Sequence, residues 1–284
     1  MKHSRIISVL TLVIIFFTSC RTGKSMQSEI RAIRSDLYYE LTTPEYLEEI
    51  IDTIYLNFID YSNIDYYTTV KRAGTIIVPL FIFNYSWEKF NVTLGESSLT
   101  QTYREFLTEA LLAESNSSAC FNLRDNAANT APDSAYMLNV KILHNRTSSA
   151  IELNNALIFM CLGDYSSFIF NFENYTVMPT VTNLRINVRL TKGKDCLLEK
   201  SYFVHHKPDY AGGKSKDSFF ANEICINRMT ESLSVATKKI VEHITEELHG
   251  LMLQNLIHRP FHKSPLTNLL EIIAPEKKRK MAYI

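Results

Sequence analysis

The sequence predicts an α+β fold, mainly an antiparallel sheet with helices packed on one face, and two observations carry that prediction. Apolar residues recur every three or four positions over 99–111 and 225–248, which is the spacing of one helix face. Over 184–190 and 196–205, apolar and polar residues alternate, as in half-buried strands. Because one-sided helices and strands must bury their apolar faces together, we expect the helices on one side of the sheet.

A helical extension is predicted ahead of this domain. Residues 25–41 place their apolar side chains at helical intervals, namely at Met26, Ile30, Ile33 and Leu37. Thr43 and Pro44 suit the cap and first turn of a second helix. Apolar residues then continue at helical spacing to Phe58. The extension therefore either packs on the main domain or acts as a spacer.

The first strand is predicted at 75–83, which is β-branched and aromatic. Pro79 lies inside it and cannot donate a ladder hydrogen bond, which implies an edge strand or a bulge. Residues 87–94 alternate and suit a returning hairpin strand. The tetrapeptide Ser98-Leu99-Thr100-Gln101 has the form of a capping box, with Ser98 as the cap, so we expect a helix from there to about Ala113.

The remaining elements follow from the same two periodicities. The expected strands are 120–123, 135–143, 157–160 and 168–170, followed by the hairpin formed by 184–190 and 196–205. A long helix is expected over 217–248, with Gly250 as a stop signal. A C-terminal extension holds a short helix capped by Ser264 and a basic end at 277–280.

Composition excludes several classes of function. The 284 residues carry 30 Lys and Arg against 30 Asp and Glu, so there is no basic excess to attract nucleic acid. Beyond Cys20, the cysteines lie far apart without a C-x-x-C pair, which removes the usual spacing of a zinc site. We expect no metal and no cofactor. The four cysteines Cys120, Cys161, Cys196 and Cys225 allow three disulfide pairings, and burial as small apolar residues is the favoured alternative.

The N-terminus has the layout of a secretory signal, in which a basic start precedes an apolar stretch and small residues. The apolar stretch, 6–17, is shorter than the roughly 20 residues that cross a bilayer. Its end, Phe17-Thr18-Ser19-Cys20, resembles the lipobox of bacterial lipoproteins. The resemblance implies cleavage before Cys20 and lipidation of its thiol, and two acyl chains hold a protein stably on a membrane. An ordinary signal peptide is the alternative.

The residues after Cys20 resemble known sorting signals. An Asp at the next position holds many lipoproteins in the inner membrane, and Arg21 stands there instead, which implies the outer membrane. The segment 21–25 also lacks the acidic residues that send some Bacteroidota lipoproteins to the cell surface, which implies the periplasmic face.

We therefore divide the chain into four parts. They are a signal peptide at 1–19, a lipidated N-terminus with a helical extension at 20–72, an α/β domain at 73–250, and a C-terminal extension with a basic tail at 251–284.

Motifs for catalysis are not evident. His205 and His206 would point to opposite faces of a strand and so could not readily bind one metal, and neither an H-E-x-x-H nor a G-x-S-x-G pattern occurs. The segment 211–215 superficially resembles a phosphate loop but lacks its first glycine at the required spacing. We therefore expect no enzymatic activity. Asp133-Ser134-Ala135 and Asp52-Thr53-Ile54 resemble the O-glycosylation signal of Bacteroidota envelope proteins, which makes Ser134 and Thr53 candidate sites.

The predicted element order over 73–250 loosely resembles the α/β domain of outer-membrane lipoproteins that assist envelope assembly, such as the curli-secretion and penicillin-binding-protein activator lipoproteins. The resemblance implies a non-enzymatic role in binding, assembly or transport. The partners would be the membrane, through Cys20, and an envelope protein or lipid. One alternative is a fimbrial or adhesion-type lipoprotein subunit, which would be nearly all-β. Another is a hydrolase with no recognisable motif.

Overall fold

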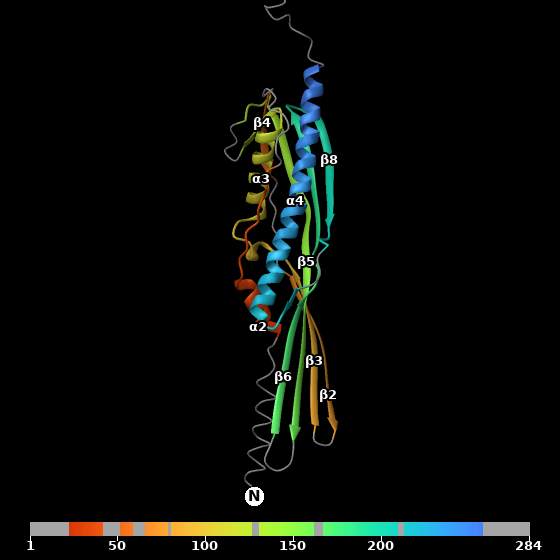
Figure 1. Cartoon of the computed structure of the whole chain (residues 1–284). Coiled ribbons are helices and arrows are strands. Elements are labelled where there is room, and N and C mark those ends of the chain that lie inside the picture. Colours follow the sequence, from red (N-terminus) through yellow and green to blue (C-terminus); the bar gives the residue numbers. More distant parts are fainter. Residues whose placement is uncertain are drawn as a thin grey trace, which may run out of the picture.

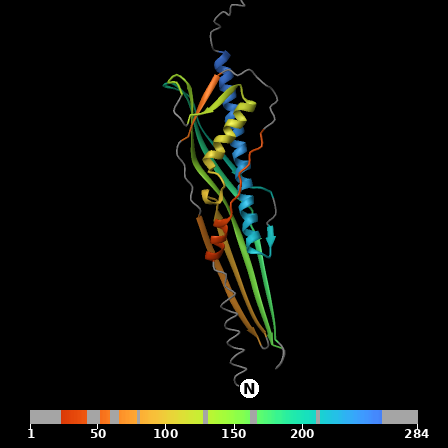
Figure 2. The same ribbon diagram turned by 90° about the vertical axis from the view of Figure 1, so that its left-hand side faces the viewer.

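A computed structural model describes residues 23–41, 52–58, 66–78, 81–126, 131–161, 167–209 and 213–257. Its elements are α2 (Gly23–Ala32), β1 (Asp52–Phe58), β2 (Tyr66–Val78), β3 (Phe81–Thr93), the 3-10 turn η1 (Glu96–Ser98), α3 (Tyr103–Ser118), β4 (Phe121–Asp125), β5 (Tyr136–Cys161), β6 (Ser167–Val177), β7 (Val181–Lys192), β8 (Asp195–His206), β9 (Gly213–Ser215) and α4 (Ser218–Ile257). Figures 1 and 2 show a body of sheet and helices from which a long arm of strands extends.

Strand β5 runs through both the body and the arm. Its first part pairs with β1 and β7, which gives the body sheet the order β8-β7-β5-β1-β4. Its second part pairs with β3 and β6, which gives the arm the order β2-β3-β5-β6. Most of the described pairs are antiparallel, but β1 runs parallel to both of its neighbours. The predicted α+β class with a mostly antiparallel sheet is thus confirmed.

Helices α3 and α4 lie on the same side of the body sheet, and α4 runs along most of its length (Figures 1 and 2). The predicted apolar stripe of the long helix is buried throughout, with every member at most 1% exposed, namely Cys225, Met229, Leu233, Ala236, Ile240, Ile244 and Leu248. This helix continues past Gly250 to Ile257. Glycine in a helix interior costs only about 1 kcal/mol, and the buried Met252 supports the extra turns.

The cap of α3 differs from the prediction. Its N-cap is Thr102, whose hydroxyl accepts a hydrogen bond from the N–H of Glu105, while the carboxylate of Glu105 accepts one from the N–H of Thr102. Ser98 lies instead in the preceding turn η1 and is buried. Two candidate capping boxes, 98–101 and 102–105, follow one another in this stretch, and in the later one Glu105 accepts the N–H of the cap residue.

The helix predicted up to Phe58 is wrong over the residues that the structure describes. Residues 52–58 form strand β1, which lies between β4 and β5. Ile54 and Leu56 are fully buried and Asn57 is exposed. An apolar run this short fits either periodicity, and pairing with two neighbouring strands decides in favour of the strand. The helix predicted over 25–41 ends at Ala32, although Ile33 and Leu37 still face the core.

The single strand predicted at 75–83 is in fact two strands. Strand β2 ends at Val78 and β3 begins at Phe81. The two strands pair antiparallel along their whole length, from the pair Val78–Phe81 to the pair Tyr66–Thr93. Pro79, for which an edge strand or a bulge was predicted, lies outside the described residues. The β7–β8 hairpin is confirmed, and its turn uses Gly193 at φ +56, a left-handed conformation that suits glycine.

Several predictions lie outside the described residues. They concern the signal segment 1–19, Cys20, the start of the second helix at Thr43 and Pro44, and everything beyond Ile257, including the short helix after Ser264. Within the part of the chain that the structure describes, no helix is long and apolar enough to cross a membrane.

Candidate functional site

The arm reverses the polarity of its two faces where it leaves the body. In the body, the side of the sheet that faces the helices is apolar, and Phe90, Ile151 and Val177 on that side are at most 5% exposed. Successive residues of a strand point to opposite faces, and the arm pairs without a register shift. Further towards the tip, the same side therefore carries Ser86, Asn155 and Glu173 in one row, and then Asn84, Leu157 and Asn171.

The opposite side of the arm, which we call the outer face, becomes apolar over the same rows. Three neighbouring strands contribute Tyr85, Ala156 and Phe172 to one row. The next row towards the tip joins Ile76, Phe83, Ile158 and Phe170. In water, an exposed sheet face is normally polar, whereas Ile76, Phe170 and Phe172 are 52%, 45% and 57% exposed.

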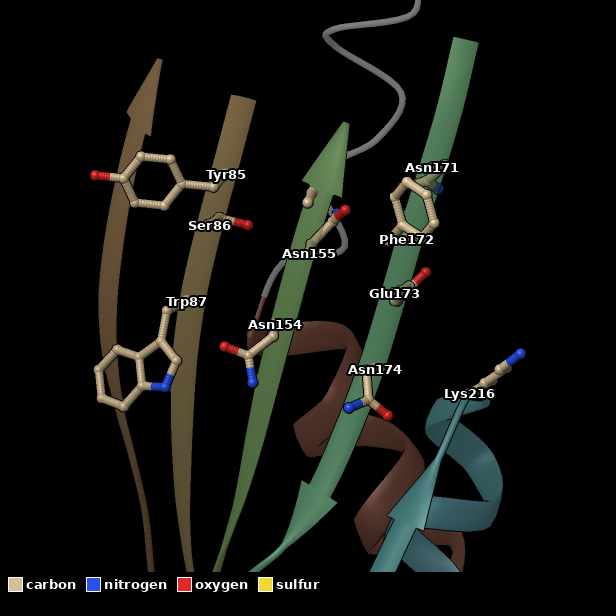
Figure 3. A pocket seen from close by; sticks show the side chains of 11 residues that line it. Tyr85, Ser86, Trp87, Asn154, Asn155, Asn171, Phe172, Glu173, Asn174 and Lys216 are labelled. Atoms are coloured by element: carbon tan, nitrogen blue, oxygen red, sulfur yellow. The ribbon is translucent and has the colours of Figure 1, made fainter. Parts of the chain in front are cut away.

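An open hollow of about 490 Å³ lies on the arm, at the edge of this apolar area that is nearer the body (Figure 3). Its lining includes Tyr85, Trp87, Asn154, Phe172 and Asn174, from β3, β5 and β6. The side chains of Tyr85 and Trp87 stand on the same side of β3 in Figure 3. Both rings have an apolar body and a polar tip, so they suit a surface with one apolar and one wet side.

Nearby contacts fix the two rings in place. The ring of Tyr85 stacks on that of Phe83, with 5.9 Å between centroids, and the guanidinium of Arg72 lies 5.5 Å from the ring centre of Trp87. Tyr85 also lies over Gly74, where a Cβ atom would come within 2.5 Å of the tyrosine hydroxyl. A larger residue at position 74 would thus displace Tyr85.

The helix-facing side of the arm holds polar groups in unusual surroundings. Asn155 Oδ1 is buried without a hydrogen-bond partner among the described residues. The hydroxyl of Tyr175 donates to the carboxylate of Glu173, and Glu88 is only 3% exposed. Within the described ranges, no three His, Cys, Asp or Glu side chains lie close enough together to hold a metal ion. What the arm presents is a surface of rings, amides and aliphatic chains, which suits binding.

The predicted site residues lie apart from the arm. Ser134 is exposed in the turn before β5, as a modified residue requires, whereas Thr53 is half-buried in the central strand β1. Cys20 lies outside the described residues. Ser134 is therefore the better placed of the two candidate glycosylation sites.

The two neighbouring histidines point to opposite sides of β8, as predicted. His205 is exposed, with Nδ1 2.8 Å from Asn183 Oδ1. His206 is half-buried, and burial, followed by the positive charge of Lys239 and by His205, lowers its pKa. The pair does not form a joint site.

The cysteines occupy different environments. Cys120 and Cys225 are buried and Cys196 is exposed. Burial raises the pKa of Cys225 to about 12, so its thiol stays protonated and packs as an apolar group. The thiol of Cys120 lies 3.9 Å from the carbonyl oxygen of His249, while the imidazole Nδ1 accepts the backbone N–H of Cys120. This imidazole is therefore not aimed at the sulfur.

One charged cluster joins the sheet to α4 and leads to a pH prediction. Glu247 accepts hydrogen bonds from Lys200 Nζ at 2.6 Å and from the hydroxyl of Tyr202 at 2.8 Å. Burial acts to raise the pKa of Glu247, but the hydrogen bonds from Lys200 and Tyr202 outweigh it, and the pKa falls below its ordinary value of 4.5. A lowered folded pKa stabilises the protein above the unfolded value, and that stability is lost as the pH falls through the folded pKa.

We therefore expect Glu247→Gln to weaken the pH dependence of unfolding below about pH 4.5, where the wild-type cluster is being protonated. Urea titrations between about pH 7 and pH 3 measure it, with the exposed neighbour substituted in Glu246→Gln as the control. If the free energy of unfolding fell equally steeply with pH in the Glu247→Gln variant and in the wild type, the lowered pKa of Glu247 would be contradicted.

The arm surface was not among the predicted sites, although the sequence carries a signal for it. In β3, alternate residues on the outer face are apolar near the tip, namely Phe83, Tyr85 and Trp87. Nearer the body, the apolar residues Phe90 and Val92 lie on the other face and are buried. The apolar phase thus shifts by one residue between Trp87 and Phe90. The same shift occurs in β5 after Leu153 and in β6 before Tyr175. A pattern search that tracked the phase along each strand would have found it.

Comparisons with known proteins give little more. No family model matches the chain, and no curated protein does. Among solved structures, protein XCC0632 from Xanthomonas campestris, of the family DUF330, is similar at a TM-score of 0.37 and 10% sequence identity. The match covers 75% of this chain and 96% of that one. A similarity of this size does not establish a shared fold or function.

Proposed function

We propose that this chain is a lipid-anchored protein of the bacterial envelope that acts by binding, in an accessory role in assembly or transport at the periplasmic face of the outer membrane. The observation that carries the proposal is the N-terminal segment that ends in Phe17-Thr18-Ser19-Cys20. Cleavage before Cys20 and acylation of its thiol would leave the folded body attached to one leaflet.

The position of α2 supports this arrangement. Its first residue, Gly23, is three residues after Cys20, a distance of at most about 11 Å even in an extended chain. Helix α2 packs on the body through Met26 and Ile30, and Glu29 Oε2 accepts a hydrogen bond from Asn222 Nδ2 at the start of α4. Acyl chains on Cys20 would therefore hold this end of the body close to the membrane.

The alternatives describe the chain less well. A fimbrial subunit was expected to be nearly all-β, whereas α3 and α4 here cover one side of the body sheet. A hydrolase needs a nucleophile next to a base, and the exposed surface that stands out is the arm with its rings and amides. A binding role therefore accounts for more of the described features.

The anchor is tested by metabolic labelling with an alkyne analogue of palmitate. We expect the full-length protein to incorporate the label and Cys20→Ser to lose it completely, because the hydroxyl cannot form the thioether of a lipoprotein. Cys196→Ser, which removes the exposed thiol of β8, is the matched control and should label like the wild type. Labelling of Cys20→Ser at the wild-type level would refute the proposal.

A further inference from the structure

We propose that the outer face of the arm, formed by the described residues of β2, β3, β5 and β6, is a second membrane contact, which lies against the acyl chains of a lipid bilayer. The inference goes beyond the anchor on Cys20, because it concerns the folded strands and holds whether or not that thiol is acylated. It rests on the chemistry of the arm residues and on the position of the arm relative to α2.

The first argument is the order of residue types along the arm. Two neighbouring rows near the tip, one on each face, are entirely apolar, and they contain Ile76, Ile77, Ile82, Phe83, Ile158, Phe159, Ile169 and Phe170. Nearer the body on the outer face come the rings of Tyr85 and Trp87. On this outer face, charged side chains begin at the level of Arg72 and continue with Lys89 and Glu152, which form an ion pair at 3.3 Å. On the helix-facing side, Glu173 lies one row nearer the tip. Apolar, then amphipathic aromatic, then charged is the order met on leaving a bilayer.

The second argument is the length of the uncharged part. In the sequence, 73–78, 81–85, 153–161 and 167–172 contain no Asp, Glu, Lys, Arg or His, and the segment 162–166, which lies outside the described residues, contains Asp164. The uncharged rows run from that of Phe81 to that of Tyr85, which is four steps, or about 14 Å along an extended strand. This is close to half of a hydrocarbon core about 30 Å thick, so the uncharged part matches a single leaflet.

The third argument concerns how the arm would lie. Between the described strands, β2 pairs only with β3, and beyond its pairing with β9 the outer edge of β6 is open. Unpaired backbone groups are costly in hydrocarbon, and the helix-facing side carries the amides of Asn84 and Asn171. Both features are satisfied if the arm enters at a slant, with its outer face towards the acyl chains and its polar face and edges at the headgroups.

The fourth argument rests on the proposed anchor at Cys20 and concerns the position of the arm at the same end of the body as α2. Figure 1 shows the arm extending from the end where α2 and the start of α4 lie. Gly23 of α2 therefore brings the anchored segment and the arm to the same end. Phe219 and Phe220, in the first turn of α4, are 54% and 58% exposed there, with their rings 6.1 Å apart. Apolar side chains at this level fit a membrane surface better than bulk water.

Trp87 is the single tryptophan of the chain, so its fluorescence reports on the arm alone. The full-length protein is bound to vesicles of phosphatidylethanolamine and phosphatidylglycerol, with or without bromine on the acyl chains. We expect Trp87 emission to shift to the blue, and brominated lipid to quench it about twofold or more. The double substitution Phe170→Asn and Phe172→Asn should remove most of this quenching and weaken vesicle binding of the Cys20→Ser protein about tenfold or more, because two exposed phenylalanines lose their apolar burial.

The matched control is Phe203→Asn, which replaces a phenylalanine of β8 that is 61% exposed on the body and should leave quenching unchanged. Circular dichroism of each variant confirms that it is folded. Absence of quenching in the wild type, or equal loss in the control, would overturn the inference. A blue shift that needs no vesicles and grows with protein concentration would also overturn it, since a second copy would then cover the face. Quenching reports on the environment of Trp87, whereas labelling reports on acylation of Cys20. The membrane contact of the arm and the lipid anchor can therefore fail independently of each other.

Discussion

Leu56→Ala is expected to lower the free energy of unfolding by about 3 kcal/mol, because a fully buried leucine leaves both its transfer free energy and a cavity behind. Leu56 is 0% exposed. It lies in β1, where it pairs with Leu138 of β5 on one side and Asp125 of β4 on the other. Few of its neighbours can move into the space, since both flanking strands are themselves fixed by hydrogen bonds.

The matched control is the next residue along the strand. Asn57 points to the exposed side, so Asn57→Ala should change stability by no more than about 0.5 kcal/mol. Urea unfolding of the two variants measures both values. Comparable losses for the two substitutions, or a small loss for Leu56→Ala, would show that residues 52–58 do not alternate between a buried and an exposed face, and the central place of β1 would be refuted.

The same strand shows where prediction from sequence ends. Both long helices follow from their apolar stripes, because a 3.6-residue repeat sustained over many turns has no competing explanation. Over 47–58, the residues Ile54, Tyr55 and Phe58 also fit a helical spacing, and the strand is selected by β4 and β5, which lie much later in the chain. Long-range pairing of this kind leaves no local signal.

The arm illustrates a different limit. Its strands were expected from the β-branched and aromatic runs around Ile76 and Phe168, but the runs say little about which face is buried. The reversal of polarity between the body and the arm becomes visible only when the register aligns Tyr85 with Ala156 and Phe172. The anchor on Cys20, by contrast, stays a prediction from sequence, because the described residues begin at Gly23.

A second large effect is expected at a chain of three buried hydroxyls that joins β5, β7 and α4. Thr182 Oγ1 lies 3.0 Å from Thr147 Oγ1 and 2.8 Å from Ser232 Oγ, and all three residues are at most 1% exposed. Thr182→Val keeps the shape but leaves two buried hydroxyls without their shared partner. Each such group costs about 1–3 kcal/mol, so we expect a loss of about 2–4 kcal/mol in the free energy of unfolding.

A neighbouring threonine provides the control, because its chemistry is the same and its bonding is not. Thr180 is 0% exposed, and its hydroxyl has no partner among the described residues. Thr180→Val should therefore be neutral or stabilising, since it removes an unsatisfied polar group from the interior. The triple variant Thr147→Val, Thr182→Val and Ser232→Ala should recover part of the loss, because no hydroxyl is then left unpaired. If Thr182→Val were as harmless as Thr180→Val, the hydroxyl chain would contribute nothing, and apolar packing alone would hold α4 to the sheet at this level.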